Sequence, residues 1–491
     1  MNVSPDNSGS VRVDGSAATS YPAVIAVTSL TVILEARPAA GYTFANWSGA
    51  VTAAVNPTYL YMDCDKTLTA TFVPDTPESL KLYFPHVASQ GPPDAWETEV
   101  CVINTSAQSL TGTLKSYRNN GQPVSSDKTI TLAAHGRWSR IVGAGDFTNP
   151  SEIGYMVFES TSDNVVGYTK FFKEGRYRTA VPAVRDVNTA DIHVPHIASD
   201  AEWWTGISLV NTTAATKVLT ISFNNGETRQ VTLTGGEHKA FDIASLFNNQ
   251  PHADIRSATI TNASGIIGLE LFGASNQLDG IPLTDKTAST LYFPHVAAGE
   301  WWTGIVAYNP SELPSPITIT PYSAQGTPLA TSTPSPIAGK EKYVGAVSDL
   351  ALPAQIAWFK IDSPQPLSGF ELFGTIDGNQ LAPYAGRGGA GAKTGVFAKI
   401  ERNGWTGITF VNTEADAASV TLTAYNDSGD VVATSMLSVG GYAKVVNLAG
   451  AIFAQDISSA SYLAYSSDKN VVGFQLNGTA DWTLLDGLPA L

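Results

Sequence analysis

Short runs of alternating apolar and polar residues, separated by turn residues, follow one another along the whole chain. The segments LTATF at Leu68 and VTLTAYNDSG at Val420 are typical of these runs. In each of them apolar residues recur at every second position, as in a β-strand with one buried face. The second run leads into an Asx-Gly turn of the hairpin type. This pattern predicts an all-β protein.

One phrase within this pattern recurs four times. It reads AWETEVCVINTS, EWWTGISLVNTT, EWWTGIVAYNPS and NGWTGITFVNTE, and its closing Asn falls at Asn104, Asn211, Asn309 and Asn412. The recurrence indicates a unit of about 100 residues copied in tandem. Each copy also opens with a strand such as LYFPHVA and closes with one such as IIGLELFG. Roughly seven short strands per copy predict an immunoglobulin-like or fibronectin-like β-sandwich.

These patterns divide the chain into five parts. We expect a small module at 1–75 and four β-sandwich repeats, numbered 1 to 4, at 80–186, 189–285, 289–386 and 393–491. The segment VPDTPES leads from the module into repeat 1. Linkers between the repeats are short, which favours a rigid or semi-rigid rod. A closed ring in which each copy supplies two propeller-like blades is the alternative.

The N-terminal part carries its own set of aromatic, Gly and Thr residues. They are Gly41, Tyr42, Phe44, Trp47, Gly49, Asn56, Pro57, Met62, Asp65, Lys66, Thr67, Thr69, Thr71 and Phe72. This set resembles the divergent internalin B-repeat family of bacterial surface proteins, whose module is small and β-grasp-like. The resemblance covers the first 75 of 491 residues. It implies an exported, non-enzymatic module of a modular surface or secreted protein.

Charge narrows the classes of partner. The formal net charge is −15, only 14% of residues are charged, and no cluster of Lys or Arg occurs along the sequence. Nucleic acid and anionic membranes both reward such clusters, so neither is expected as a partner. No apolar stretch approaches the length of a membrane-spanning helix, and we expect no membrane insertion. The first residues lack a signal-peptide pattern, so for an exported protein we expect the signal to be absent from this chain.

Cysteine and acidic residues leave two questions open. Only Cys64 and Cys101 are present, which excludes a disulfide scaffold and a multi-cysteine metal site. A single disulfide between them and two unpaired thiols are both open, and Cys101 takes a strand position that we expect to tolerate solvent. No cofactor is expected, with the exception that calcium is a candidate at acidic turns near Asp186, Asp191 or Asp285.

Several repeated residues suggest chemistry but have simpler explanations. The Pro-His pairs at His86, His196 and His295 lie one repeat apart, too far to share a metal, and the fourth copy has Lys399 instead. Each His is expected to hydrogen-bond within its own repeat. Glu270 and Glu371 are also one repeat apart, and we expect them on a solvated strand face. The closing Asn is expected to end its strand through an Asx-type bond to the backbone.

The aromatic residues divide into two sets. Trp204, Trp302 and Trp405 align, and we expect them in the sandwich cores. Trp203 and Trp301 precede two of them and, because neighbouring strand residues face opposite sides, should lie outside or at a junction. These two are candidates for stacking on a sugar or peptide. Packing against the preceding repeat is the alternative.

No motif of a hydrolase, metalloprotease, nucleotide-binding protein or EF-hand is found. We therefore expect a non-enzymatic, extracellular or cell-surface bacterial protein that acts as a spacer, adhesion or assembly component. Its partner would be a cell-surface or matrix protein or a polysaccharide, and self-assembly is open. The alternative is a carbohydrate- or polymer-binding array accessory to a secreted hydrolase, with Trp203 and Trp301 as stacking residues. An enzyme of unrecognised class is a third hypothesis.

Overall fold

The computed structural model divides the chain into two compact units, Met1–Leu80 and Lys81–Leu491. The described residues are 1–18, 20–74, 80–89, 96–124, 127–143, 145–274, 277–297, 299–350, 352–376, 380–385 and 387–491. Most of the VPDTPES segment, residues 75–79, lies outside them. Within these ranges no helix has the length and apolarity to cross a membrane.

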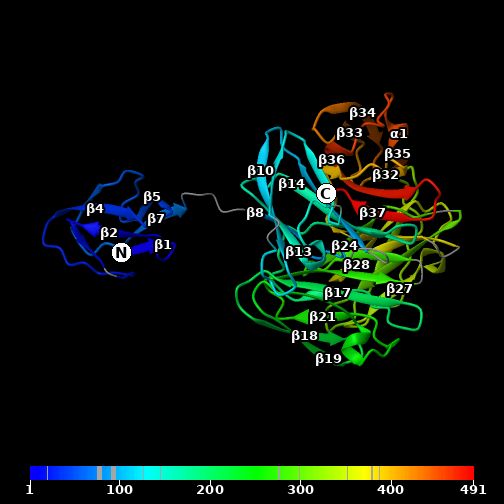
Figure 1. The fold of residues 1–491 in the computed structure, drawn as a ribbon, viewed down its shortest axis with the longest axis horizontal. Coiled ribbons are helices and arrows are strands. Elements are labelled where there is room, and N and C mark those ends of the chain that lie inside the picture. Colours follow the sequence, from blue (N-terminus) through cyan, green and yellow to red (C-terminus); the bar gives the residue numbers. More distant parts are fainter. Residues whose placement is uncertain are drawn as a thin grey trace. The chain divides into compact units, whose positions relative to one another are not determined.

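The N-terminal unit consists of two small sheets around one apolar core (Figure 1). Its strands are β1 (Asn2–Ser4), β2 (Gly9–Val13), β3 (Ser16–Ala17), β4 (Thr31–Pro38), β5 (Tyr42–Gly49), β6 (Thr58–Tyr61) and β7 (Leu68–Pro74). The sheet orders are β1-β7-β5 and β3-β2-β4-β6. Trp47 and Phe72 are fully buried between the sheets. The aromatic residues of the sequence pattern therefore form this core.

Repeat 1 is a sandwich of two four-stranded sheets. The first sheet has the order β11-β10-β13-β8, and the second, which contains the strand that follows the repeated Trp, has the order β12-β9-β14-β15. The elements are β8 (Leu80–Phe84), β9 (Glu97–Asn104), β10 (Leu110–Tyr117), β11 (Lys128–Leu132), β12 (Arg137–Ile141), η1 (Pro150–Glu152), β13 (Tyr155–Ser160), β14 (Val165–Lys173) and β15 (Tyr177–Pro182).

Repeat 2 has the same plan, with a first sheet β16-β21-β18-β19 and a second sheet β20-β17-β22-β23. Its elements are β16 (Ile192–Val194), β17 (Trp204–Asn211), β18 (Lys217–Phe223), β19 (Thr228–Leu233), β20 (His238–Asp242), η2 (Ala244–Phe247), β21 (Ala258–Thr261), β22 (Ile266–Gly273) and β23 (Leu278–Pro282).

In repeats 3 and 4 one long strand, β28 or β36, takes part in both sheets of its sandwich. Repeat 3 contains β24 (Ala288–Phe293), β25 (Trp301–Tyr308), β26 (Thr318–Tyr322), β27 (Lys342–Ala346), η3 (Val347–Leu350), β28 (Trp358–Thr375) and β29 (Leu381–Ala385), followed by β30 (Arg387–Gly388). Repeat 4 contains β31 (Ala392–Phe397), β32 (Gly404–Asn412), β33 (Ala418–Tyr425), β34 (Val431–Val439), β35 (Lys444–Leu448), α1 (Ala449–Ile452), β36 (Tyr462–Thr479) and β37 (Leu485–Pro489). The predicted all-β fold with tandem β-sandwich repeats is confirmed.

The two sheets of a sandwich differ in how many of their faces are buried. Strand β10 of a first sheet alternates between buried and more exposed residues, as expected when one face meets solvent. Strand β17 of a second sheet is almost continuously buried from Thr205 onward. The second sheet therefore has a covered outer face, by which we mean the face turned away from its own sandwich core.

That outer face packs on the preceding repeat at every boundary. Val210 and Ile267 of repeat 2 join Tyr83, Tyr155 and Val157 of repeat 1 in one apolar cluster. The next cluster joins repeat 2 to Val306 and Phe370 of repeat 3. The third joins repeat 3 to Val411 and Phe474 of repeat 4. The last joins repeat 4 to Cys101 and Tyr168 of repeat 1. The last of these contacts closes the series into a ring. Such a head-to-tail arrangement is stable when its rotation closes, as it does here after four copies.

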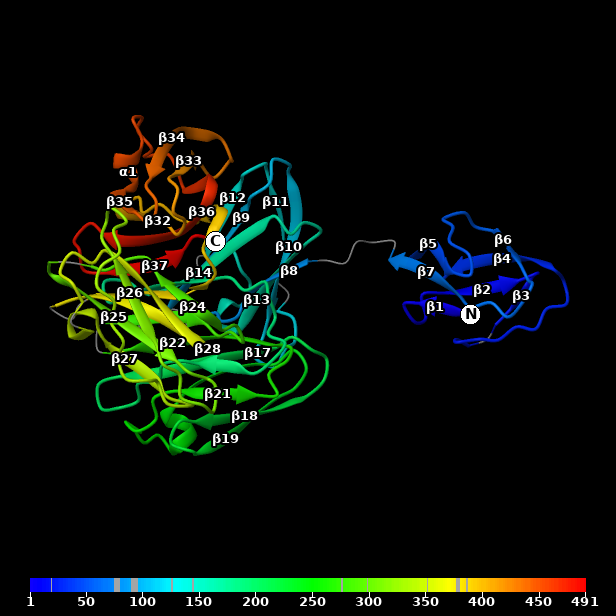
Figure 2. The same cartoon turned by 180° about the vertical axis from the view of Figure 1, so that it is seen from behind.

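The closing strands β15, β23, β29 and β37 lie at the centre of this ring. Each contacts the closing strands of the two neighbouring repeats. Both views show repeat 1 (cyan) beside repeat 2 (green) and beside repeat 4 (orange to red) (Figures 1 and 2). The prediction of a rod is therefore wrong. The closed ring of the alternative is therefore found, and each copy supplies its two packed sheets to it.

The repeated Asn ends its strand as predicted. Asn211 is fully buried, and its Oδ1 accepts a hydrogen bond from the Thr213 amide at 3.0 Å. Its Nδ2 also donates to the carbonyl oxygens of Ala215, Leu233 and Thr234. The same arrangement recurs at Asn104, Asn309 and Asn412. One amide side chain thus fastens the strand end to the adjacent loop in every repeat.

We predict that residues 81–491 scatter X-rays as one compact particle. A globular body of this length has a radius of gyration of about 22 Å. Four sandwiches joined end to end would give roughly twice that value. Small-angle scattering of a chain limited to the ring distinguishes the two, and a value near that of the rod would contradict the closed ring.

We also predict that Asn211→Ala lowers the free energy of unfolding by about 2–3 kcal/mol, because it leaves several buried carbonyl groups without a donor. Urea unfolding measures this change. Asn225→Ala is the control, since Asn225 lies in an exposed turn, and it should cost less than about 1 kcal/mol. Equal effects of the two substitutions would contradict the role assigned to the buried amide.

Candidate functional site

The histidines of the Pro-His pairs lie at the boundaries between repeats. His86 Nδ1 is 3.2 Å from His238 Nε2 of repeat 2, and His196 Nδ1 is 2.8 Å from Lys342 Nζ of repeat 3. Burial lowers the pKa of His86 to about 4, so this ring is neutral at pH 7. The prediction that each histidine is satisfied within its own repeat is wrong for these two. They pack two repeats together.

Glu270 and Glu371 are fully buried, which contradicts their predicted place on a solvated face. The strands that carry them belong to second sheets, whose two faces are both covered. Burial raises the pKa of each carboxyl group well above its usual range, against the opposing charges of Lys342 and Lys444. In the folded protein both groups are therefore held in the neutral form at mildly acidic pH.

One basic residue occupies the same place at every boundary. It pairs across the sheet with the residue just before the repeated Asn, and the four examples are Arg137, His238, Lys342 and Lys444. Burial lowers the pKa of Lys342 and of Lys444 to about 7. Each boundary thus combines an apolar cluster with a buried titratable group.

The boundary between repeats 4 and 1 is the most highly charged. Arg178 of repeat 1 forms ion pairs with Asp486 and Glu401 of repeat 4. Lys399 Nζ lies 2.9 Å from Asp486 Oδ2 and 3.0 Å from Glu401 Oε2. Although burial opposes it, the charges of Arg178 and Lys399 hold the pKa of Asp486 well below its usual range. The other closing strands place leucine where repeat 1 has Arg178.

A second charged group continues this boundary on the side of repeat 1. Glu99 accepts a hydrogen bond from Tyr168 Oη at 2.6 Å and lies 2.6 Å from Lys170 Nζ. Although burial opposes it, Lys170 and Lys399 hold the pKa of Glu99 well below its usual range. Arg137 reaches across to repeat 4, where its Nη1 is 3.0 Å from Asp427 Oδ1. Charges from both repeats are therefore interleaved where the ring closes.

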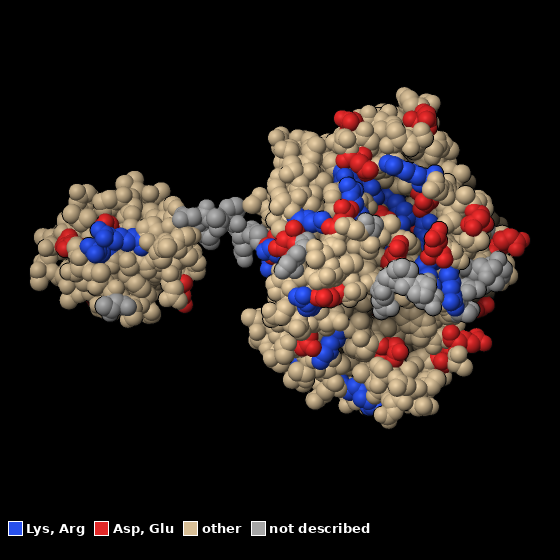
Figure 3. Space-filling model, in the orientation of Figure 1, with Lys and Arg blue, Asp and Glu red and all other residues tan. Residues whose placement is uncertain are grey.

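These residues line a cleft of about 450 Å³ between the two repeats. Five cations and three carboxylates face it, and the charged lining consists of Arg137, Arg140, Lys170, Lys399, Arg402, Glu99, Glu401 and Asp427. On the face shown in Figure 3, Lys and Arg side chains gather in a hollow of the larger unit with Asp and Glu near its edge. In a chain of net charge −15, a cleft with an excess of cations is the exception.

The structure has both cysteines as free thiols. Cys64 is exposed, whereas Cys101 is fully buried in the apolar cluster that joins repeats 1 and 4. Burial raises the pKa of Cys101 to about 12. Its position does not tolerate solvent, contrary to the prediction, because the outer face of the second sheet is covered.

The aligned tryptophans are not sandwich-core residues. Trp204 is 38% exposed, and Trp302 and Trp405 are half-buried. Each lies over a glycine of the adjacent strand, Gly273, Gly374 or Gly478, where any side chain would collide with the indole. Trp203 is half-buried in the cluster between repeats 2 and 3, and Trp301 is also half-buried. Ligand binding by Trp203 or Trp301 stays a prediction.

A different tryptophan presents an aromatic surface to solvent. Trp482 is 56% exposed and stacks on Trp405, with ring centroids 4.9 Å apart and an interplanar angle of 29°. Its backbone has a φ of 60°, a left-handed conformation that is strained for a bulky residue. The turn is held by Asp481 Oδ1, which accepts hydrogen bonds from Thr479 Oγ1 and Thr483 Oγ1. The surroundings thus fix an unfavourable conformation that exposes the indole.

A second hollow, of about 790 Å³, lies where the closing strands end. Its wall includes Pro182, Pro282, Ala385 and Leu491, one from each repeat. The lining is mostly aliphatic and proline side chains, and it lacks the concentration of charge found in the cleft between repeats 4 and 1.

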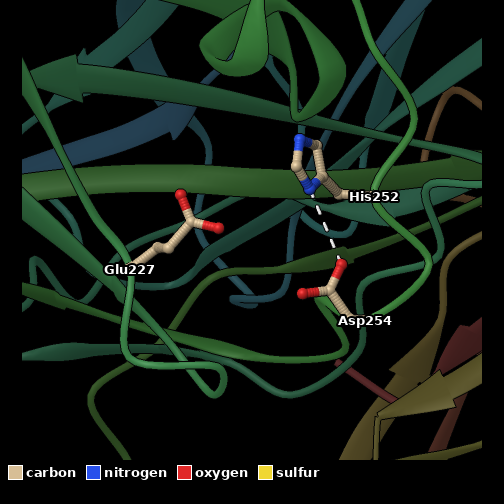
Figure 4. A group of neighbouring side chains, drawn as sticks. All are labelled: Glu227, His252 and Asp254. Atoms are coloured by element: carbon tan, nitrogen blue, oxygen red, sulfur yellow. Dashed lines mark ion pairs between the residues drawn. The ribbon is translucent and has the colours of Figure 1, made fainter.

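Of the residues that the structure describes, one group has the spacing of metal ligands: Glu227, His252 and Asp254 (Figure 4). Protein donors already hold both carboxylates. Glu227 pairs with Arg229 at 3.0 Å, and Asn225 Nδ2 donates to Glu227 and to Asp254. The carboxylate of Asp285, near which calcium was considered, accepts hydrogen bonds from the Thr189 and Ala190 amides. Calcium binding stays an untested prediction.

Comparison with known proteins identifies the N-terminal unit. Residues 1–76 match the Divergent InlB B-repeat domain. No curated protein matches the chain. Among solved structures, the chain is similar to SGBP-B of a Bacteroides ovatus mixed-linkage glucan utilization locus, solved with a mixed-linkage heptasaccharide. The identity is 11%, the match covers 75% of this chain and 92% of that one, and the TM-score is 0.13. The B-repeat module thus agrees with the resemblance seen in the sequence.

Sequence reasoning missed the cleft and the Trp405–Trp482 pair. The cleft joins residues from opposite ends of the ring, and nothing in the spacing of Arg137 and Arg402 indicates that they meet. One signal for the ring was present in the repeated phrase. The runs ISLV, IVAY and ITFV at Ile207, Ile305 and Ile408 lack the alternation of a strand with a solvent face.

We predict that Glu270→Gln changes how stability depends on pH. In the wild type Glu270 is neutral when folded but ionises in the unfolded chain above its ordinary pKa of 4.5, so the free energy of unfolding falls as pH rises. Glutamine cannot ionise. The advantage of the variant should therefore grow by up to about 1.4 kcal/mol per pH unit between about pH 4.5 and pH 7.

Urea unfolding across this pH range measures the effect. Repeat 4 supplies the reciprocal control, because Gln475 occupies the position of Glu270 there and is buried as well. Gln475→Glu should add the same dependence on pH. Parallel stability profiles for the wild type and Glu270→Gln would contradict the assignment of a neutral buried carboxyl.

Proposed function

We propose that this protein is a non-enzymatic, extracellular binding protein that a bacterium secretes or carries on its surface, and that its four-repeat ring attaches to a polysaccharide. The B-repeat module supports the extracellular context, because modules of this family occur in bacterial surface proteins. The exposed Trp482, stacked on the half-buried Trp405, carries the proposal of a polysaccharide ligand. Its geometry supplies a flat apolar surface surrounded by hydrogen-bonding groups, which suits the face of a sugar ring.

The architecture favours adhesion over a spacer role. A spacer gains length when repeats are joined end to end, whereas these repeats close on themselves. The buried state of the repeated histidines and glutamates supports a non-enzymatic role, since these groups stabilise boundaries between repeats and are withdrawn from solvent. The same binding function would also suit an accessory part of a secreted hydrolase.

The Trp405–Trp482 pair is suited to binding because it is preorganised. Trp405 lies against Gly478 and stacks on Trp482, so the two rings restrain each other. The side-chain amide of Gln380 of repeat 3 donates to the carbonyl oxygen of Trp482, which ties the turn to the neighbouring repeat. A platform fixed before binding loses little conformational entropy when a ligand arrives.

We predict that Trp482→Ala weakens polysaccharide binding by at least about tenfold, the loss expected for a central aromatic contact. Biolayer interferometry of the full chain on a panel of immobilised neutral and acidic polysaccharides measures this change. Met436→Ala is the matched control, because Met436 is an exposed apolar residue of the same repeat, and it should bind as the wild type does. Failure of the wild type to bind any polysaccharide, or undiminished binding by Trp482→Ala, would overturn the proposal.

A further inference from the structure

We infer that the ligand is a carboxylated polysaccharide, bound by the charged cleft between repeats 4 and 1 together with the Trp405–Trp482 pair. The inference rests on the proposed function, and it names the class of polymer. Three observations carry it: the short segment of repeat 4 that joins the two surfaces, the excess of cations in the lining of the cleft, and the exposure of two of its arginines.

The cleft and the aromatic pair lie at the two ends of one short segment of repeat 4. Lys399, Glu401 and Arg402 line the cleft, and the same segment of repeat 4 continues into Trp405. Three residues of chain span at most about 11 Å, so Arg402 lies within this distance of Trp405, measured between Cα atoms. Ala480, in the turn that carries Trp482, donates its amide to the carbonyl oxygen of Asn403 at 3.2 Å, which fixes this turn beside the segment. The cleft lies between repeats 4 and 1, whereas the turn of Trp482 contacts Gln380 of repeat 3. A sugar polymer would therefore reach both by crossing the end of repeat 4 that carries this segment.

The inner cations of the cleft hold the ring together. Lys399 and Lys170 are largely buried and are engaged by Asp486, Glu401 and Glu99. These pairs balance one another, and withdrawing a carboxylate from them would leave a buried charge without a partner. Lys399 and Lys170 therefore contribute a positive potential at the mouth of the cleft, and a ligand does not displace their carboxylate partners.

The outer cations of the cleft, Arg402 and Arg140, are exposed where a ligand can reach them. Arg402 of repeat 4 is 59% exposed and has only a 3.7 Å contact with Asp427 and a hydrogen bond to Ser461 Oγ. Arg140 of repeat 1 is 52% exposed, with its Nε 3.2 Å from Asp146. Arginine binds carboxylates through paired, charge-assisted hydrogen bonds. A carboxylate at the mouth of the cleft thus finds exposed guanidinium groups on both walls.

The other boundaries lack this combination. In place of Arg137 they have His238, Lys342 or Lys444, each buried against the preceding repeat. Their aligned tryptophans, Trp204 and Trp302, have no second tryptophan stacked on them among the described residues. The carboxylate-binding site is therefore assigned to one boundary of four.

The test compares a carboxylated polymer with its own neutral form. Immobilised polygalacturonate and hyaluronate, each beside its carboxyl-reduced derivative, are offered to the full chain in biolayer interferometry. Chondroitin sulfate is added to separate carboxylate from sulfate recognition. We expect at least one carboxylated polymer to bind about tenfold or more tightly than its reduced form, with an affinity that falls as salt is added.

Arg402→Gln is expected to remove most of this preference while leaving the weaker binding of the reduced polymer unchanged. Arg256→Gln is the matched control, since Arg256 is a similarly exposed arginine that bridges repeats 2 and 3 through Glu341. Trp482→Ala should weaken binding of the acidic and reduced polymers alike. The thermal midpoint of each variant, equal to that of the wild type, shows that the fold is kept.

The outcomes separate this inference from the proposed function. Equal binding of acidic and reduced polymers, tighter binding of the sulfated polymer than of both carboxylated ones, or an undiminished preference in Arg402→Gln overturns the carboxylate site but leaves polysaccharide binding in place. Binding of neither form of any polymer overturns both.

Discussion

The packing of each second sheet on the preceding repeat is the constraint on which the ring depends. A β-sheet that is apolar on both faces must find a second partner besides its own sandwich. In this chain the partner is the neighbouring copy, so Val210 and Ile267 cover repeat 1, and Cys101 and Tyr168 cover repeat 4. Each copy has one surface that packs on the preceding copy and one that receives the following copy. A series of such copies either extends indefinitely or closes into a ring. Closure after four copies leaves none of these faces exposed.

Closure also explains where the polar residues lie. An apolar boundary alone would allow the repeats to slide, whereas buried polar groups fix the register at a cost in desolvation. Three boundaries use one basic residue against a histidine or a neutral glutamic acid, as at Lys342, His196 and Glu270. The boundary between repeats 4 and 1 joins the ends of the ring and uses Arg178, Asp486, Lys399 and Glu401 instead. Its charges are paired inside and exposed only at the mouth of the cleft.

The local features of the fold could be predicted from the sequence because they depend on neighbours in the chain. The Asx bond of Asn211, the alternating strand β10 and the N-terminal B-repeat module all follow from patterns a few residues long. The rod could not be distinguished from the ring by linker length. Glu270 was assigned to solvent because a lone carboxylate in an alternating strand is usually exposed. Its burial follows from the second partner of its sheet, a long-range contact that local periodicity does not report.

The same reasoning explains why the repeated phrase does not point to Trp482. Trp204, Trp302 and Trp405 recur because each covers a glycine of the adjacent strand. That structural role is common to repeats 2, 3 and 4. The departure from the repeat is Trp482, in a turn of repeat 4 that the phrase does not contain. Repetition therefore marks the residues that build the ring. Two residues depart from the repeat: Trp482, in a turn that contacts Gln380 of repeat 3, and Arg178, at the boundary between repeats 4 and 1.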